Sequence, residues 1–355
     1  MLSSTPGLAV DHTGEVAASD LILITGSSGF IGTRVVENLL ERGFSNLRCF
    51  VRPSSELGTL NDILTKYRSA SKVDIITGDL ASNDDCRKAA EDVSVVFHLA
   101  AGFQKSFAEA LRNSALITRN IIEALLELGK LKRFVNVSSF AVYSNLRMGR
   151  GALLDESSPL EDVPEERCEA YAFAKLKQEE VVREYGCTRS LPFVILRPGT
   201  VFGPGKRQLT GRVGINVFGV FLHIGGSNLL PLTYVTNCAD AIVRAGIAPR
   251  VEGEIFNVVD DDLLTSREFL QAYRQHVKRF PCVRFPYFAA YVLSAMYECF
   301  GKYCSRQPPR FSRRRCAAEW KGNRFSNRKL REQLRWKPPV PITQAMELFL
   351  ADINQ

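Results

Sequence analysis

The sequence predicts an α/β fold built on a doubly wound parallel sheet with a smaller, mostly helical C-terminal part. Two observations carry this prediction. Short apolar runs recur over roughly the first 200 residues, and segments with helical spacing of apolar side chains lie between them. Three glycines, Gly26, Gly29 and Gly32, follow the first apolar run and precede the first helical segment. That is the position of a nucleotide-phosphate turn in such sheets.

The expected strands are short and contain few polar residues. Leu21 to Ile24 is an unbroken apolar run that ends in the glycines, as a buried parallel strand would. A helix follows from Thr33 to Arg42, and Gly43 stops it. Further strands are expected at 47–51, 73–77, 95–99, 134–137 and 193–196, with a helix at 117–128.

After Gly199 the alternation of strand-like and helix-like segments becomes less regular. We expect a loop rich in glycine and cations from Gly203 to about Leu230, then a helix over 234–245 and a sheet strand over 254–259. From Leu263 onward the sequence predicts helices and is rich in basic residues. The expected organisation is a flexible leader (1–19), a cofactor-binding domain (20–200, completed by about 234–260), and a substrate-binding subdomain (201–233 and 261–355).

Composition describes an ordinary globular protein, with 45% hydrophobic and 24% charged residues. Nine cysteines are scattered without a C-x-x-C pair, and only four histidines are present. This excludes the common zinc frameworks, so we expect reduced thiols and no metal. The first 20 residues lack the basic and apolar regions of a signal peptide, and we expect a cytoplasmic protein.

The net charge of +8 is concentrated near the C-terminus. Residues 302–337 hold thirteen Lys/Arg and two Asp/Glu, a net charge of +11. Such a segment can bind an anionic substrate, an acidic membrane or nucleic acid. Alternatively, it is a basic surface that contacts only solvent. We expect no nucleic-acid partner. The longest apolar run, Phe285 to Phe300, contains Pro286 and Glu298 and is too short for a transmembrane helix. It is either a core helix or the wall of an apolar pocket.

Tyr171 and Lys175 carry the strongest chemical signal. Four residues apart, they share one face of a helix. An ammonium beside a phenol favours the phenolate and lowers the tyrosine pKa, which suits a proton exchanger next to a nicotinamide. Ser139, at the end of the fifth strand, is placed to donate to a substrate oxygen, with Ser138 as its competitor. These residues predict an oxidoreductase.

Arg52 and Asp79 bear on the cofactor. Arg52 follows the second strand, where a cofactor with a free ribose 2′-hydroxyl prefers Asp or Glu. A guanidinium can pair with a 2′-phosphate, so Arg52 favours NADP over NAD as the cofactor. In the alternative interpretation, Arg52 only caps the edge of the sheet. Asp79, beside Leu80, either accepts a hydrogen bond from an adenine amino group or caps the following turn.

Taken together, the motifs resemble the extended short-chain dehydrogenase/reductase superfamily, in its NAD-dependent epimerase/dehydratase branch, with features of its 3β-hydroxysteroid dehydrogenase and dihydroflavonol reductase relatives. The match covers most of the chain. Its motifs are Thr25-Gly26-x-x-Gly29-x-x-Gly32, Gly78-Asp79-Leu80, His98-Leu99-Ala100-Ala101, Val137-Ser138-Ser139, Asp155-Glu156-Ser157-Ser158-Pro159, Tyr171-x-x-x-Lys175, Leu196-Arg197-Pro198-Gly199-Thr200-Val201-Phe202-Gly203-Pro204-Gly205 and Tyr234-Val235-x-Asn237-x-Ala239-Asp240-Ala241.

The resemblance implies a Rossmann-type fold and assigns roles. Tyr171 would be the acid/base, Lys175 would bind the nicotinamide ribose and lower the tyrosine pKa, and Ser139 would orient the substrate. His98 would be a packing residue. The implied cofactor contacts are Gly26, Ser28, Gly29, Phe30, Ile31, Arg52, Asp79, Leu80, Leu99, Ala100, Ala101, Tyr171, Lys175, Pro198, Thr200 and Val201.

Differences from the family's motifs reduce the number of reactions and substrates expected for this chain. Nucleotide-sugar 4,6-dehydratases carry Thr-Asp-Glu after the fifth strand, whereas this chain has Ser139-Phe140-Ala141 and so lacks that acid pair. The Val51-Arg52-Pro53 turn looks more like the steroid dehydrogenase relatives, while the cationic loop suits a diphosphate. The expected substrate contacts are Ser139, Phe140, Arg207 and Arg212.

We therefore expect an NAD(P)-dependent oxidoreductase or epimerase that acts by hydride transfer at a secondary alcohol or ketone carbon of a small molecule, with a nucleotide sugar as the favoured substrate and a homodimer as the expected assembly. Two alternatives remain open. One is an NADP-dependent reductase or dehydrogenase of an apolar ketone or sterol. The other is a non-catalytic NADP-sensing or nucleic-acid-binding protein, against which the intact Ser139, Tyr171 and Lys175 argue.

Overall fold

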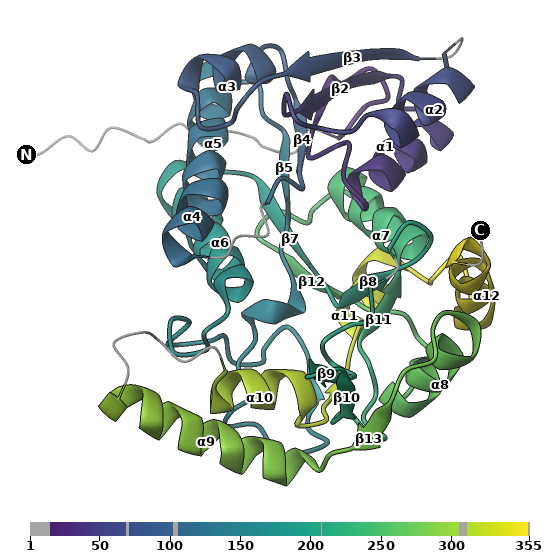
Figure 1. Ribbon diagram of the computed structural model, residues 1–355. Helices are drawn as coiled ribbons and strands as arrows, with labels where there is room; N and C mark the ends of the chain where they lie inside the picture. Colours follow the sequence, from purple (N-terminus) through teal and green to yellow (C-terminus); the bar gives the residue numbers. More distant parts are fainter. Residues whose placement is uncertain (1–14, 69–70, 102–105, 207, 305–310, 354–355) are drawn as a thin grey trace, which may run out of the picture.

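A seven-stranded parallel sheet forms the centre of the molecule, in the order β12-β7-β5-β4-β1-β2-β3 (Figure 1). The computed structural model describes residues 15–68, 71–101, 106–206, 208–304 and 311–353, so the expected leader lies mostly outside it. All neighbouring strands of this sheet run parallel, which confirms the predicted fold class. The strands are β1 (Ile22–Thr25), β2 (Asn46–Val51), β3 (Lys72–Thr77), β4 (Val95–His98), β5 (Arg133–Val137), β7 (Phe193–Pro198) and β12 (Ile255–Val258).

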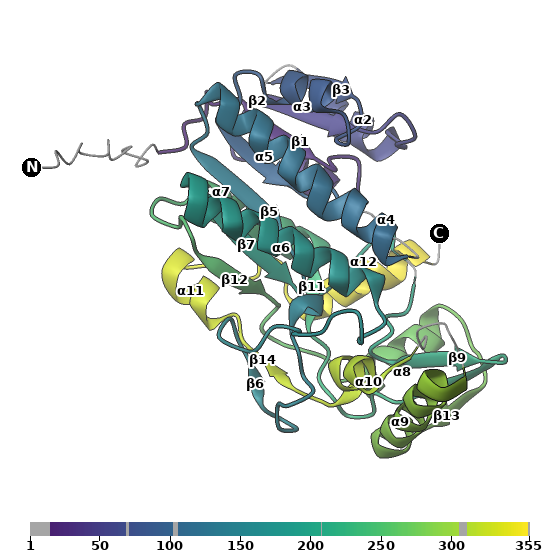
Figure 2. The ribbon, with the colours of Figure 1, turned by 90° about the vertical axis from the view of Figure 1, so that its left-hand side faces the viewer.

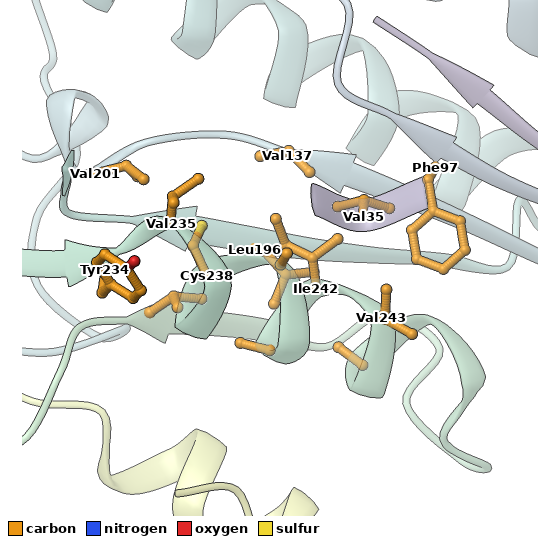
Figure 3. Close-up of a cluster of buried hydrophobic side chains, with 14 of the residues drawn as sticks. Val35, Phe97, Val137, Leu196, Val201, Tyr234, Val235, Cys238, Ile242 and Val243 are labelled. Atoms are coloured by element: carbon orange, nitrogen blue, oxygen red, sulfur yellow. The ribbon is translucent and has the colours of Figure 1, made fainter. Parts of the chain in front are cut away.

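Helices cover both faces of the sheet, and the strands bury side chains on both faces. On β1, Ile22 and Ile24 join the core under α1 and α7, whereas Leu23 joins the core under α3, α5 and α6. Figure 3 shows part of the first core, where Val35, Phe97 and Ile242 meet. The helices are α1 (Gly32–Glu41), α2 (Gly58–Lys66), α3 (Asn83–Ala90), α4 (Phe107–Leu111) continued by a π-helical turn (Arg112–Leu116), α5 (Ile117–Leu128), α6 (Ala170–Arg189) and α7 (Val235–Ile247).

The strand order creates a topological switch point between β1 and β4. From β1 the chain moves outward to β2 and β3, and then returns to the other side of β1 with β4. The loops that follow β1 and β4 therefore separate at the carboxyl edge of the sheet. Ligands of doubly wound folds bind in the crevice at this place.

The second part of the molecule gathers beyond the carboxyl edge of the sheet (Figure 2). It contains three small sheets and five helices among the described residues, and it is mostly helical, as expected. The elements are β6 (Leu153–Leu154), β8 (Thr200–Phe202), β9 (Gly214–Val217), β10 (Val220–His223), β11 (Leu232–Tyr234), α8 (Ser266–His276), β13 (Cys282–Arg284), α9 (Tyr287–Cys304), α10 (Arg313–Trp320), β14 (Arg324–Phe325), α11 (Arg328–Leu334) and α12 (Ile342–Ile353).

The expectation of a plain loop from Gly203 to about Leu230 was wrong. β9 and β10 form an antiparallel hairpin in this stretch, and β13 pairs in parallel with β10. The hairpin turns at Phe218 and Gly219, which both have positive φ angles (49° and 87°). Such angles suit a two-residue hairpin turn. The alternating apolar residues on either side of this turn were a signal that the composition of the segment obscured.

The apolar run from Phe285 to Phe300 adopts neither structure expected for it. It forms most of α9, which lies along the outside of the molecule (Figures 1 and 2). Phe288, Leu293 and Met296 are more than half exposed, so α9 is not a core helix. Among the described residues, no helix combines the length and apolarity needed to cross a bilayer.

Candidate active site

A groove made of two joined cavities runs along the carboxyl edge of the sheet. The larger cavity has a volume of about 520 Å³ and the smaller about 200 Å³. Gly26, Gly29, Leu99 and Ala101 line both, so the cavities meet over the turn that follows β1. Every residue expected to contact a dinucleotide lines one or both cavities. The structure thus brings the expected contacts together, while their roles remain predictions.

The glycine turn forms a cradle that side chains would fill. Gly26 has a φ of +73°, and a Cβ on it would lie 3.0 Å from the backbone nitrogen of Ala100. A Cβ on Gly32 would lie 2.1 Å from the carbonyl oxygen of Gly26. Both positions therefore require glycine. Because α1 begins at Gly32, its free N–H groups point toward the turn, which fits the pyrophosphate of a dinucleotide.

The smaller cavity holds the residues expected around an adenosine. Arg52 lines it from an exposed position, and its backbone nitrogen donates to the Ser55 hydroxyl over 3.0 Å. Asp79 also lines it, but one of its carboxylate oxygens accepts from the backbone nitrogen of Ala81 over 2.9 Å. Asp79 therefore caps the turn, as one of its two interpretations predicted, while its contact with an adenine amino group stays a prediction.

The larger cavity brings together the expected catalytic residues. Tyr171 and Lys175 lie on one face of α6, and Ser139 caps the short 3-10 helix Phe140–Val142 that follows β5. A hydrogen bond joins the hydroxyl groups of Ser139 and Tyr171. Ser138 faces the carboxylate of Glu179 instead. Of the two serines, Ser139 is therefore the one beside the phenol.

Burial raises the pKa of Tyr171 above its usual range, although the Ser139 hydrogen bond opposes this effect. The expectation that Lys175 lowers the tyrosine pKa does not hold for the protein without cofactor. Lys175 Nζ donates to the Val137 carbonyl oxygen over 2.6 Å and to Gln178 Oε1 over 2.9 Å. Its ammonium is thus directed into the protein, and desolvation dominates at the phenol. Tyr171 is therefore protonated at neutral pH, as a proton donor must be.

A buried hydrogen-bond network continues from Lys175 to the strand before the glycine turn. Gln178 Nε2 donates to the Thr118 hydroxyl over 3.1 Å, and Thr118 contacts His98 Nε2 over 2.9 Å. The other ring nitrogen of His98 lies 2.8 Å from the Thr25 hydroxyl. Burial lowers the pKa of His98 to about 3, so the ring is neutral. His98 therefore does more than pack, since it links two hydroxyl groups of the network.

Sequence reasoning missed Gln178 and Thr118. Gln178 lies three residues after Lys175 on the same helix, so helical spacing alone could have identified it. Thr118 comes from α5, and only the packing of α5 against α6 brings it near. No local pattern could have predicted that contact.

A buried ion pair fixes α6 against the sheet. Arg197 on β7 donates to both carboxylate oxygens of Glu179 over 2.9 and 2.7 Å. It also donates to the Tyr143 hydroxyl over 2.9 Å, and its guanidinium lies over the Tyr143 ring. Glu179 is one turn beyond Lys175, and its negative charge partly offsets the effect of burial on the lysine pKa.

A charged wall closes the end of the larger cavity near Tyr171; it consists of Arg167, Glu169, Arg212 and Glu319. Arg167 Nε donates to Glu169 over 2.9 Å, and Arg212 Nη1 donates to the Ala318 carbonyl over 2.8 Å. Burial raises the pKa of Glu319, so this carboxyl is shifted toward its neutral form. The wall therefore combines two guanidinium groups with two carboxyl groups.

The structure describes three of the four residues that we expected to contact the substrate. Ser139, Phe140 and Arg212 line the larger cavity, as does Lys206. Arg207 lies outside the described residues. Sequence reasoning did not single out Arg167, Glu169 or Glu319, because they lie outside the motifs from which the site was predicted. Among the described residues, no cluster of His, Cys, Asp or Glu could hold a metal ion, and the eight described cysteines form no disulfide.

Comparison with known families and proteins gives consistent results. A family model described as "NAD dependent epimerase/dehydratase family" matches residues 22–258. The structure is similar to that of a UDP-glucuronic acid 4-epimerase from Bacillus cereus in complex with UDP-glucuronic acid and NAD, with a TM-score of 0.68 and 20% sequence identity. That similarity covers 94% of this chain and 99% of the other, and it concerns the fold.

The curated relatives fall into two groups. A sterol-4-alpha-carboxylate 3-dehydrogenase of Schizosaccharomyces pombe is 28% identical over 93% of this chain and 96% of its own length. An uncharacterized UDP-glucose epimerase of Bacillus subtilis is 29% identical over 67% of this chain and 76% of its own. A 3beta-hydroxysteroid-dehydrogenase/decarboxylase of Arabidopsis thaliana is 24% identical over 91% of this chain, and the chain spans 60% of that relative's length.

The buried ion pair predicts a large effect on stability. Arg197→Met should lower the free energy of unfolding by about 3–5 kcal/mol, because it removes the buried partner of Glu179 and leaves this carboxylate only the partly exposed Arg183. The double variant Arg197→Met/Glu179→Leu should recover most of this loss. Urea denaturation measures both. Arg87→Met is the control, since it breaks the exposed Arg87–Glu127 pair and should cost less than about 1 kcal/mol. If Arg197→Met and Arg87→Met lost equal amounts of free energy of unfolding, the Arg197–Glu179 pair would not have the stabilising role that we assign to it.

Lys175 predicts a pH dependence of stability. Burial lowers its pKa from 10.5 to about 8. Between these values the unfolded chain keeps the proton that the folded protein has released, so stability rises with pH. Below about pH 8 the buried ammonium destabilises the fold. The free energy of unfolding of the wild type should therefore rise relative to that of Lys175→Met between about pH 8 and 10.5, by at most about 3 kcal/mol. If the difference in free energy of unfolding between the wild type and Lys175→Met does not change with pH, the pKa of Lys175 is not lowered.

Proposed function

This chain belongs to the NAD dependent epimerase/dehydratase family, and we propose that it transfers a hydride at a secondary alcohol or ketone carbon of a nucleotide sugar, with NADP preferred over NAD. The family resemblance inferred from the motifs is confirmed, and the chain is an enzyme of the extended short-chain dehydrogenase/reductase type that depends on a nicotinamide cofactor. The substrate, the NADP preference and the residue roles are parts of the proposal. The charged wall beside Tyr171 is the observation that carries it.

The charged wall favours a polar, anionic substrate. Arg167 and Arg212 lie with Glu169 and Glu319 next to the phenol. Burial raises the pKa of the Glu319 carboxyl. An apolar sterol pressed against these groups would desolvate them without offering hydrogen bonds, which is costly. A diphosphate or a sugar hydroxyl would instead accept charge-assisted hydrogen bonds from the guanidiniums. In addition, α9 does not contribute to the described lining of the cavity, so it does not supply the apolar wall expected from it for a sterol.

Domain roles follow from the lining residues. The sheet and its loops supply the glycine turn, Ser139, Tyr171 and Lys175, and 201–233 together with 261–355 supply Thr210, Gly211, Arg212 and Glu319. We therefore assign substrate binding to the second part of the molecule. A homodimer and a cytoplasmic location remain predictions, and sedimentation equilibrium tests the first of them.

The mechanism assigns a task to each catalytic side chain. The nicotinamide cofactor supplies or accepts the hydride when it is bound. Tyr171, protonated because it is buried, holds the proton that a ketone oxygen requires on reduction. Ser139 is within hydrogen-bonding distance of the phenol and orients the same oxygen. Lys175 is held by Val137 and Gln178. We assign it to the nicotinamide ribose, and its ammonium favours the phenolate only when it turns from these two partners toward Tyr171.

A sterol or other apolar ketone is the second candidate substrate. The relative from Schizosaccharomyces pombe, similar over nearly the whole length of both chains, is a sterol-4-alpha-carboxylate 3-dehydrogenase. Its named substrate carries a carboxylate as well as a sterol nucleus. Arg212 offers a positive charge to such a group too, so the choice between the two classes rests on experiment.

The acid/base assignment predicts that Tyr171→Phe abolishes turnover and leaves cofactor affinity nearly unchanged. The substitution removes one hydroxyl group and little volume. Lys175→Met should impair both properties, because we assign the ammonium to the ribose as well as to the phenol. Cofactor titration by fluorescence, combined with steady-state kinetics, separates the two effects. If Tyr171→Phe retained most of the wild-type rate, the acid/base assignment would be wrong.

The NADP preference rests on Arg52. Arg52→Ala should weaken NADP binding by about 1.5–3 kcal/mol, since it removes a charge-assisted contact to the 2′-phosphate, and should leave NAD binding nearly unchanged. Fluorescence titration of the two cofactors with both proteins measures this. Arg48→Ala is a matched control on the strand that precedes Arg52, because Arg48 donates to the carbonyls of Ala89 and Glu91 away from the groove. Equal or stronger NAD binding by the wild type would exclude the preference.

The substrate proposal predicts that UDP and UDP-sugars raise the melting temperature of the protein by mass action. The effect should weaken at high salt. Arg212→Gln should reduce UDP affinity by about 1.5–3 kcal/mol, because it removes a charged donor from the wall. Arg87→Gln, on the exposed face of α3, should leave it unchanged. If UDP-sugars have no effect while a steroid or flavonoid ketone is turned over, the second candidate is correct.

A further inference from the structure

Helix α9 presents large apolar side chains to the outside of the molecule. They recur at intervals of three to five residues, which places them on one side of the helix. Their exposed fractions lie between 39% and 74%, high values for side chains of this size. The residues of this apolar face are Phe288, Val292, Leu293, Met296, Tyr297 and Phe300.

The opposite side of α9, which packs on the protein, contains polar residues. Ser294 is buried, and its hydroxyl donates to the Ala290 carbonyl over 2.6 Å. Glu298 accepts from the backbone nitrogen and from Nε of Arg313, both over 2.6 Å. A surface helix normally buries its apolar side and exposes its polar side. In α9 the packed side also carries apolar groups, because Ala290 and Tyr291 join a buried apolar cluster with α10. The helix is therefore apolar on both sides, and packing within this chain covers only one of them.

Two further apolar side chains lie at the same end of the molecule. Val283 on β13 is 55% exposed, and Phe218, at the tip of the β9–β10 hairpin, is fully exposed. Figures 1 and 2 both show α9, β13 and the hairpin side by side at the end remote from β3. An apolar patch of this extent on a protein surface marks a contact with a partner or a membrane.

Positive charge accumulates beside the apolar face. A hollow of about 560 Å³ lies between α8 and β13, and four arginines line it: Arg267, Arg274, Arg279 and Arg284. Among the described residues, no carboxylate lines the hollow and no ion pair neutralises any of the four. His223, at the bottom of the hollow, has a lowered pKa, first because it is buried and then because Arg267 and Arg284 are near.

Strand β13 connects the two features. Val283 and Arg284 are consecutive and point to opposite sides of the three-stranded sheet, the first toward α9 and the second into the hollow. β13 is an edge strand of this sheet and lies between α8 and α9 in both views (Figures 1 and 2). A flat surface that approaches this edge therefore meets apolar and cationic groups together. The sequence adds six Lys/Arg and no Asp/Glu over 302–315, directly after most of α9.

We propose that this end of the protein binds the surface of an anionic lipid bilayer, with the apolar face and Phe218 inserted between the headgroups and the arginine hollow in contact with lipid phosphates. Interfacial helices combine an apolar side with flanking Lys/Arg in this way. A second copy of this chain would bring two arginine hollows toward each other, so like charges oppose that occupant. Phe218 projects from a hairpin tip as a wedge, which suits the fluid headgroup region better than a flat protein surface.

Sedimentation of the full-length protein with lipid vesicles tests this proposal. The wild type should pellet with vesicles of equimolar phosphatidylcholine and phosphatidylglycerol, about tenfold more strongly than with phosphatidylcholine alone, and high salt should release it. Phe288→Ser/Met296→Ser should reduce binding at least about tenfold, because it removes two inserted side chains. Arg267→Gln/Arg284→Gln should reduce binding to the anionic vesicles alone.

Leu128→Ser/Leu348→Ser is the matched control, since both leucines are 43% exposed on other elements, and it should bind like the wild type. Melting temperatures establish that the variants fold. Wild-type protein that ignores anionic vesicles, or a Phe288→Ser/Met296→Ser variant that binds them undiminished, overturns the proposal. So does self-association of the wild type that this variant abolishes, which would identify a second copy as the occupant. Stabilisation by inorganic pyrophosphate through the arginines, without vesicle binding, would reveal a soluble-anion site instead.

Discussion

The position of the candidate active site depends on one buried ion pair. Arg197 on β7 and Glu179 on α6 are both almost inaccessible to solvent, and each would be costly to bury alone. Their two-fold hydrogen bonding therefore permits only one rotation of α6 against the sheet. Tyr171 lies two turns and Lys175 one turn before Glu179 on the same side of this helix, so that rotation also points them into the groove.

The buried polar network gives the lysine a second fixed point. Hydrogen bonds lead from Lys175 through Gln178, Thr118 and His98 to Thr25, the residue before the glycine turn. The catalytic helix and the nucleotide turn are thus joined through the interior of the sheet. A network of this kind stabilises one arrangement only when all of its members are satisfied. A neutral His98 meets this condition, because its two ring nitrogens contact hydroxyl groups that can donate or accept.

The two ends of the molecule face different chemical environments. The charged wall of the larger cavity is enclosed, so its guanidiniums act on a bound molecule at low dielectric, where each hydrogen bond is strong. The cations around β13 are open to solvent and act at longer range on whatever the apolar face of α9 contacts. The basic C-terminal segment recognised in the sequence therefore contributes to both ends. Arg315 lies near the wall, while Arg313 holds α9 through Glu298.

The sequence by itself determined the parallel sheet, the glycine turn and the placement of Ser139, Tyr171 and Lys175, because each depends on local spacing or on residues that follow a strand. It could not determine the tyrosine pKa, since the direction of the lysine Nζ toward Val137 and Gln178 is set by packing. Contacts between distant segments, such as Glu319 near Glu169, were also decided only by the tertiary structure. The same holds for α9. Its apolar residues are plain in the sequence, but which side of the helix the protein covers depends on where Arg313 and α10 lie.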